Sequence, residues 1–130
     1  MDPIANMIIM LKNAGASKHP SITVPFSKVK HAIAECLEKH GYLASVSKKT
    51  NKKGMYTLEL GLVYNEAGEP KIRNVKRMSK PSRRSYAGVK DIYPVKNGYG
   101  MMVLSTPKGI LSDKDARKEQ VGGELLFTIV

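Results

Sequence analysis

The chain of 130 residues has a single cysteine, no tryptophan and few aromatic residues, 6% in all. One cysteine, Cys36, excludes a disulfide within the chain, which is typical of a reducing compartment. No apolar run approaches the roughly 20 residues that a membrane-spanning helix needs. The beginning, "MDPIANM", lacks the basic and apolar regions of a signal peptide. We therefore expect a cytoplasmic protein that has no membrane partner.

Residues that catalysis and metal binding require are also scarce. Cys36 and His40 lie four residues apart on a predicted helix with His31 nearby, but structural zinc needs four ligands and there is no Cys-x-x-Cys. The three histidines all lie in the first half of the chain, away from Ser105, and there is no Gly-x-Ser-x-Gly or glycine-rich phosphate loop. We expect no catalytic site, metal or cofactor, and we interpret Cys36 as a buried thiol.

Acidic residues are few, and this is the strongest signal in the composition. Lys and Arg number 22 against 11 Asp and Glu, which gives a net charge of +11 and an isoelectric point near 9.8. Residues 71–96 hold nine of the basic residues against Asp91 alone. The alternatives are a solvated, solubilising face or an acidic membrane surface, but no basic amphipathic helix with a bulky aromatic face is present. The charge therefore favours nucleic acid as the partner.

Two helices are predicted in the first part of the chain. The first has Asp2 as N-cap, Pro3 in the first turn and Gly15 as its stop signal. The second is capped by Ser27 and ends at Gly41. Its apolar face comprises Val29, Ala32, Ile33, Cys36, Leu37 and His40. Both helices are expected to cover one sheet.

Three strands complete this half. They are residues 21–24, "YLASVS" at 42–47 and "MYTLELGLVY" at 55–64, the last two joined by the basic loop "KKTNKKG". In the third strand, alternate residues from Tyr56 to Tyr64 share one face. The predicted order is α-β-α-β-β.

The turn-rich "NEAGEP" predicts a boundary between two small packed halves, residues 1–66 and 67–130. After it we expect a basic strand at 72–79, a loop at 80–88 and a strand at 100–106 that is buried on both faces. A short helix capped by Ser112 and ending at Gly122-Gly123 precedes a last strand. The predicted fold class is α+β, with an N-terminal α-β-α-β-β half and a C-terminal β-rich half with one short helix.

Two stretches of the second half carry groups suited to RNA. In "RRSY", Arg83 and Arg84 offer guanidinium forks for phosphate and Tyr86 offers an aromatic face, although Tyr86 packing on the sheet is the alternative. In "STPKG", small hydroxyls, a lysine and a glycine follow a buried strand. Such a loop presents donors and acceptors to a ligand, while the alternative is an ordinary strand-to-helix turn.

Three ordered motifs then give a resemblance that covers essentially the whole chain. "DPIANMIIMLKNAG", "SKPSRRSY" and "NGYGMMVLSTPKGILSDKDARKEQVGGE" resemble the bacterial-type eighth protein of the small ribosomal subunit. The resemblance implies the same two-part fold and no enzymatic activity. It implies direct binding to the central domain of small-subunit rRNA, with other small-subunit proteins as neighbours. Members in many bacteria also repress their own operon mRNA, which the resemblance makes a further partner.

The resemblance also implies RNA contacts at matching positions. The main contact comprises Ser105, Thr106, Lys108 and Gly109, with Tyr86 and the turn of Gly122, Gly123 and Glu124 close by. Secondary contacts are Asp2, Pro3, Asn6, Lys28 and Lys30, and phosphate neutralisation comes from Lys80, Arg83 and Arg84. Glu124 is expected to accept a hydrogen bond from an RNA amino or hydroxyl group, or to order the loop lysine.

Two positions depart from the family pattern. Pro107 stands where the family usually has serine, so it removes an N–H and a hydroxyl from the loop. Ser82 stands where the family usually has glycine, which affects the aim of Arg83 and Arg84 if that backbone needs a positive φ. The alternatives in function are a stand-alone RNA-binding regulator or chaperone outside the ribosome, and a metal-dependent nuclease-like enzyme, which would need clustered acids or histidines.

Overall fold

The computed structural model of the chain describes residues 2–92 and 100–130. Lys96 of the basic segment and the first residues of "NGYGMMVLST" lie outside the described residues. Packing divides the chain into one unit of Pro3–Arg73 and a second of Asn74–Val130 together with Asp2. The boundary expected after residue 66 stays a prediction. The described residues form helices and two antiparallel sheets, so the predicted α+β class is confirmed.

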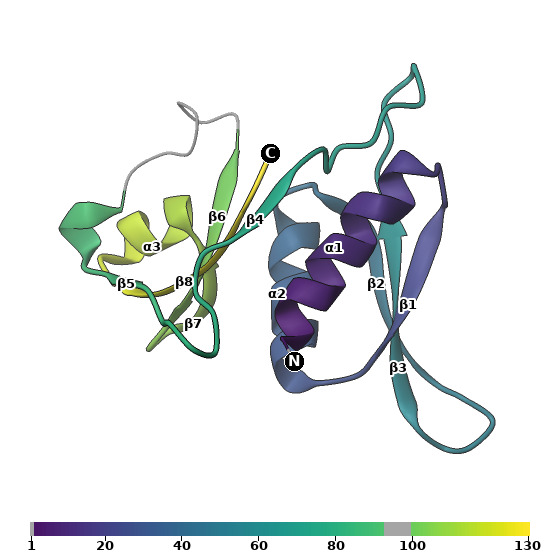
Figure 1. Cartoon of the computed structure of the whole chain (residues 1–130), viewed down its shortest axis with the longest axis horizontal. Helices are drawn as coiled ribbons and strands as arrows, with labels where there is room; N and C mark the ends of the chain where they lie inside the picture. The colour runs from purple at the N-terminus through teal and green to yellow at the C-terminus, as the bar shows by residue number, and fades with distance from the viewer. Residues whose placement is uncertain (1, 93–99) are drawn as a thin grey trace. The chain divides into compact units, whose positions relative to one another are not determined.

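The unit of residues 3–73 has the predicted α-β-α-β-β order. Its elements are α1 (Pro3–Ala16), β1 (Ser21–Pro25), α2 (Lys28–Lys39), β2 (Leu43–Thr50) and β3 (Tyr56–Leu62). The strands form an antiparallel sheet in the order β1-β3-β2, and α1 and α2 lie on one side of it (Figure 1). Both helices therefore cover one face of the sheet, as expected.

The core of this unit lies between that face and the helices. Leu58 and Leu60 of β3 are fully buried. Leu60 lies opposite Ile22 of β1 and Val46 of β2, so the alternating apolar residues of three strands share one face. The helices contribute Met7, Ile8, Leu11, Ile33 and Leu37, each at most 1% exposed. This burial of apolar side chains is the main stabilising term for the unit.

Two details of the helices differ from the sequence prediction. Gly15 does not end α1, because the helix continues to Ala16 and the left-handed residue that follows it is Lys18, with φ 62°. The glycine instead makes room for Pro70, since a Cβ at position 15 would lie 2.9 Å from Pro70 Cβ. The Ser27 cap is confirmed, since its Oγ accepts from Lys30 N at 3.1 Å. Val29, expected on the buried face of α2, is 49% exposed because the buried stripe begins one turn later, at Ile33.

The second unit is β-rich with one short α-helix, as predicted. Its elements are β4 (Val75–Arg77), β5 (Tyr86–Ala87), the 3₁₀ turn η1 (Val89–Asp91), β6 (Met101–Thr106), β7 (Gly109–Ser112), α3 (Asp113–Glu119) and β8 (Gly123–Ile129). The sheet order is β4-β8-β6-β7, and β5 also pairs with β8. Met102 and Leu104 of β6 pack with Ala116 of α3 and Ile92, so the helix covers one face of this sheet (Figure 1).

Several boundaries in this unit were predicted wrongly. The loop after β6 does not lead directly into a helix, because Gly109–Ser112 pair back on β6 as β7. The basic strand is Val75–Arg77 rather than 72–79, and the loop at 80–88 contains β5. The helix ends at Glu119 with Gln120 in the left-handed conformation, φ 57°, and not at Gly122-Gly123. Strand pairing over two to four residues leaves little periodic signal, which explains the missed strands.

Candidate nucleic-acid interface

Three predicted contact residues lie side by side across three strands. Glu124 of β8 is directly opposite Tyr86 of β5 on one side and Ser105 of β6 on the other. Residues directly opposite one another project from the same face of a sheet. The neighbouring pair Leu104 and Leu125 faces α3, so this cross-strand row of Tyr86, Glu124 and Ser105 projects from the other face.

The cross-strand row is accessible at one end and enclosed at its centre. Tyr86 is 69% exposed, so packing on the sheet does not explain this tyrosine. The Glu124 side chain is only 15% exposed, and Ser105 is half-buried. The row thus presents an aromatic ring with a carboxylate and a hydroxyl beside it.

Gly122 and Gly123, which directly precede Glu124 in the chain, have no room for a side chain. A Cβ at Gly123 would lie 2.1 Å from Ser105 O, and one at Gly122 would lie 2.3 Å from Ala87 O. These glycines let β8 approach β5 and β6 closely. Glu124 is accordingly a strand residue rather than part of a turn. Contact of either glycine with RNA stays a prediction.

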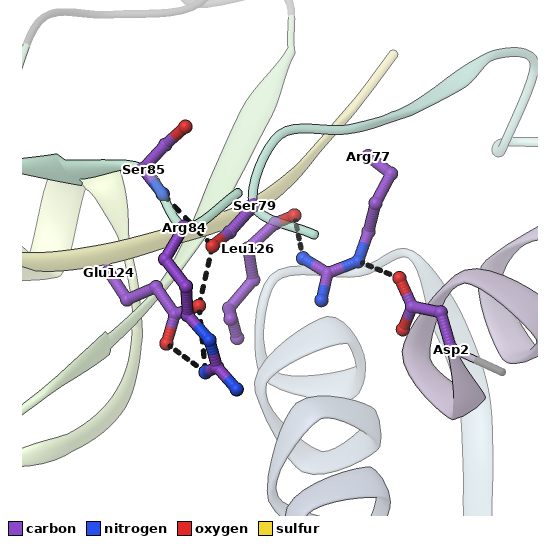
Figure 2. A network of polar contacts seen from close by, with 7 residues as sticks. All are labelled: Asp2, Arg77, Ser79, Arg84, Ser85, Glu124 and Leu126. Carbon is purple, nitrogen blue, oxygen red and sulfur yellow. Dashed lines mark hydrogen bonds and ion pairs between the residues drawn. The ribbon is translucent and has the colours of Figure 1, made fainter. Parts of the chain in front are cut away.

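A polar network holds the centre of the row (Figure 2). Ser79, which is fully buried, donates from Oγ to Glu124 Oε2 at 2.5 Å and accepts from Ser85 N at 3.0 Å. Arg84 Nη1 lies 3.3 Å from both oxygens of Glu124. The segment before β5 is therefore tied to β8 at both of its ends. Lys108 pairs with Glu119 at 3.2 Å, so the expectation that Glu124 orders this lysine is wrong.

The basic residues Lys80 and Arg83 flank a tight turn within this segment. Arg83 N donates to Lys80 O at 3.0 Å, and Lys80 N donates to Arg83 O at 2.9 Å. Positive φ among the described non-glycine residues is confined to Lys18 and Gln120, so Ser82 needs no glycine-like backbone. Both basic side chains are exposed, and no carboxylate of residues 2–92 or 100–130 pairs with either. They remain available to an external anion.

The predicted main contact forms the tip of the β6–β7 hairpin. Thr106 Oγ1 donates to Gly109 O at 2.8 Å and accepts from Lys108 N at 3.1 Å. Two-residue hairpins favour positive φ at the first loop position, which Pro107 cannot adopt; here the positive φ, 110°, is at Gly109. The Thr106 hydroxyl has thus used its proton within the turn and keeps acceptor capacity for a ligand.

Asp2 belongs by packing to the same unit as this interface. Its carboxylate accepts from Arg77 Nε at 2.8 Å, and Arg77 Nη1 also donates to the carbonyl of Leu126 (Figure 2). The two charged side chains are 12% and 18% exposed. The carboxylate of Asp2 therefore has a structural partner, and its contact with RNA stays a prediction.

The other secondary contacts lie in the unit of residues 3–73. Pro3 and Asn6 are exposed on α1. Lys28 is exposed in the first turn of α2, and Lys30 Nζ donates to Pro25 O at 3.1 Å. These residues are not part of the cross-strand row.

Ser79 and Arg77, the two residues that anchor the network, could not be predicted from the sequence. Both lie within the basic segment of residues 71–96, but no spacing marks a serine as buried or an arginine as an ion-pair partner.

In the described part of the chain, no group of three or more His, Cys, Asp or Glu could hold a metal ion. None of the helices there has the length and apolar character needed to cross a membrane.

Comparison with known proteins adds a direct finding. The family model described as Ribosomal protein S8 matches residues 2–130. Small ribosomal subunit protein uS8 of Nitrobacter winogradskyi is 43% identical over 128 residues, 98% of this chain and 96% of its own. The protein of the same name from Ruegeria pomeroyi is 44% identical, with 98% of both chains covered.

Proposed function

Because the chain belongs to the ribosomal protein S8 family, we propose that it is a structural constituent of the small ribosomal subunit and binds the central domain of small-subunit rRNA directly. Its role is to fix RNA structure during subunit assembly, and it performs no chemistry. Its relatives are ribosomal proteins, which supports a protein that is not an enzyme.

The observation that supports RNA binding most directly is the cross-strand row. A base displaced from its helix can stack on the exposed ring of Tyr86. Side chains cannot read the narrow major groove of A-form RNA, so recognition falls on the shallow minor groove, its 2′-hydroxyls and unstacked bases. The hydroxyl of Ser105 and the Thr106 turn are short enough to approach such a surface closely.

Charge supplies affinity around these recognition groups. Arg84 is held beside Tyr86 by Glu124, and it keeps further N–H donors for phosphate. Lys80 and Arg83 are exposed in the neighbouring turn. The ion pair of Lys108 with Glu119 is exposed, 55% and 49%, so a phosphate can displace Glu119 at little cost. Each neutralised phosphate releases counterions and adds affinity that does not depend on sequence.

The remaining partners follow from the same proposal. Neighbouring small-subunit proteins are expected to contact the chain in the assembled particle. Operon mRNA that imitates the rRNA site would bind the same surface and allow translational repression. The proposed location is the ribosome in the cytoplasm, with no membrane, metal or cofactor involved.

Hydroxyl-radical footprinting on naked small-subunit rRNA tests the proposal. With the purified chain as the only protein, we expect protected nucleotides to cluster in the central domain. Protection that is absent, or scattered over the whole rRNA, would overturn direct binding to the central domain.

Sedimentation separates this function from that of a stand-alone RNA regulator. The chain should cosediment with small subunits from a bacterial lysate and stay with them after a high-salt wash. A chain that remains at the top of the gradient while still binding RNA would act outside the ribosome.

A further inference from the structure

The turn between β2 and β3 (Figure 1) carries a concentration of positive charge that the proposed site does not use. Residues 48–56 contain four lysines and no acidic residue. Lys49 is paired with Glu59 at 2.8 Å. No carboxylate in the described ranges pairs with Lys48, Lys52 or Lys53, so three positive charges are left without a counter-charge.

Aromatic rings lie directly beside these charges. Phe26 N donates to Tyr56 O at 3.2 Å, and the two rings meet edge to face with centroids 6.2 Å apart. Lys48 Nζ lies 4.3 Å from the centroid of each ring. Tyr56 is nevertheless 55% exposed and the adjacent Met55 is 63% exposed.

Core packing does not account for this cluster. Along β3 the residues on the helix-covered face change from fully buried Leu60 and Leu58 to Tyr56, where more than half of the residue is exposed. The ring lies beyond the part of the sheet that the helices cover. An exposed tyrosine with a lysine over it, next to two more lysines, is a combination that binds a ligand which is both anionic and aromatic.

We propose that Phe26, Lys48, Lys52, Lys53 and Tyr56 form a second RNA-binding surface, here called the hairpin surface. An unpaired base stacks on Tyr56, and the lysines bind the phosphates on either side of it. Stacking on an aromatic ring next to a cationic track is the general way in which proteins hold single-stranded nucleic acid. Protein interfaces are depleted in lysine, which argues against a protein as the occupant. The inference rests on the proposed function only in taking RNA as the ligand.

The test uses the full chain and an unstructured oligouridine in a fluorescence anisotropy titration over a series of salt concentrations. The double variant Lys52→Ala with Lys53→Ala is compared with Lys114→Ala with Lys118→Ala, which removes the same charge from exposed positions on α3. We expect the hairpin variant to bind about tenfold more weakly at low salt, with a salt slope smaller by about 1.4 for two lost phosphate contacts. Equal losses in the two variants would overturn the proposal. This outcome is also the one expected if the surface binds an acidic protein and not RNA.

Stacking is tested at the ring itself. Tyr56→Phe should bind like the parent chain, whereas Tyr56→Leu should bind about fivefold or more weakly, because only the former keeps an aromatic face. An unchanged affinity of Tyr56→Leu would overturn the proposal.

Photocrosslinking of the unaltered chain to oligouridine with a photoreactive base gives a readout that needs no variant. A crosslink at Tyr56 is expected, and crosslinks confined to the second unit would overturn the proposal.

These measurements test the hairpin surface separately from the proposed binding to central-domain rRNA. If central-domain protection is absent while the Tyr56 and lysine variants lose affinity, the proposed function fails and the hairpin surface stands. If protection is present while these variants bind normally, the proposed function stands and the hairpin surface fails.

Discussion

The hydroxyl of Ser79 donates to Glu124 Oε2 at 2.5 Å across 45 residues of sequence. Ser79 Oγ in turn accepts from the backbone N–H of Ser85, so one buried serine joins the segment before β5 to the carboxylate at the centre of the cross-strand row. Arg84 reaches Glu124 from the same segment. The position of Arg84 and Tyr86 therefore depends on a group that never reaches the surface.

Replacing Ser79 by alanine should destabilise the protein. Ser85 N–H loses its acceptor and Glu124 loses a donor in a largely buried place, and such a loss costs about 1–3 kcal/mol. Chemical denaturation should show this decrease in the free energy of unfolding. Ser82→Ala, at an exposed position of the same segment, is the matched control and should change stability by no more than about 0.5 kcal/mol. Similar values for the two variants would contradict the role of Ser79.

Two variants at Glu124 should distinguish the contribution of its hydrogen bond with Ser79 from that of its negative charge. Glu124→Gln keeps an oxygen that can accept from Ser79, so its stability should stay within about 1 kcal/mol of the parent chain, whereas Glu124→Ala should lose more. Both should weaken binding to the central-domain rRNA, because Arg84 no longer has a carboxylate partner. The comparison requires denaturation curves and RNA titrations of both variants. If both leave folding and affinity unchanged, Glu124 has neither role.

Thr106 should affect specific recognition more than general RNA affinity. Thr106→Ala removes a hydroxyl that caps the hairpin turn and keeps an acceptor for RNA. We expect a loss of about 1 kcal/mol or more in binding the rRNA fragment and no change with a scrambled RNA, since phosphate contacts carry no sequence information. Thr106→Ser keeps the hydroxyl and should bind normally. Equal losses of Thr106→Ala on both RNAs would refute the prediction.

Gly123 should tolerate no side chain. Gly123→Ala would place a methyl group against the backbone of Ser105, where a Cβ has only 2.1 Å, so about 2 kcal/mol of stability should be lost as β6 and β8 separate. Gly88→Ala is the control, because its Cβ would be 3.9 Å from the nearest atom. Thermal unfolding followed by circular dichroism compares them. A stable Gly123→Ala protein would show that the strands can move apart without cost.

Elements with periodic apolar residues or strong capping signals could be predicted from the sequence. The repeat of Leu58, Leu60 and Leu62 indicates a strand buried on one face, and the Ser27 and Ser112 caps are present where the pattern predicts them. β5 and β7 could not be predicted, because Tyr86–Ala87 and Gly109–Ser112 are short and depend on partners elsewhere in the chain. Short strands take their stability from pairing rather than from local preference.

The candidate site divides in the same way. Tyr86, Ser105 and Glu124 could be named from sequence motifs, but only the register of β5, β8 and β6 places them in one row. Ser79 could not be identified, since burial of a hydroxyl is a property of tertiary packing. The structure also explains why the turn accommodates Pro107, because the turn needs no N–H at that position and the positive φ is at Gly109.

The most direct test of the central claim is the affinity of Tyr86→Ala for a central-domain rRNA fragment and for a scrambled RNA of equal length, measured across a salt series. The parent chain should keep a large preference for the fragment at high salt, where charge contributes least. Tyr86→Ala should bind the fragment about tenfold or more weakly, as expected for one lost stacking contact, and bind the scrambled RNA as before. If the parent chain binds both RNAs alike and both affinities fall together with salt, the cross-strand row does not recognise this RNA.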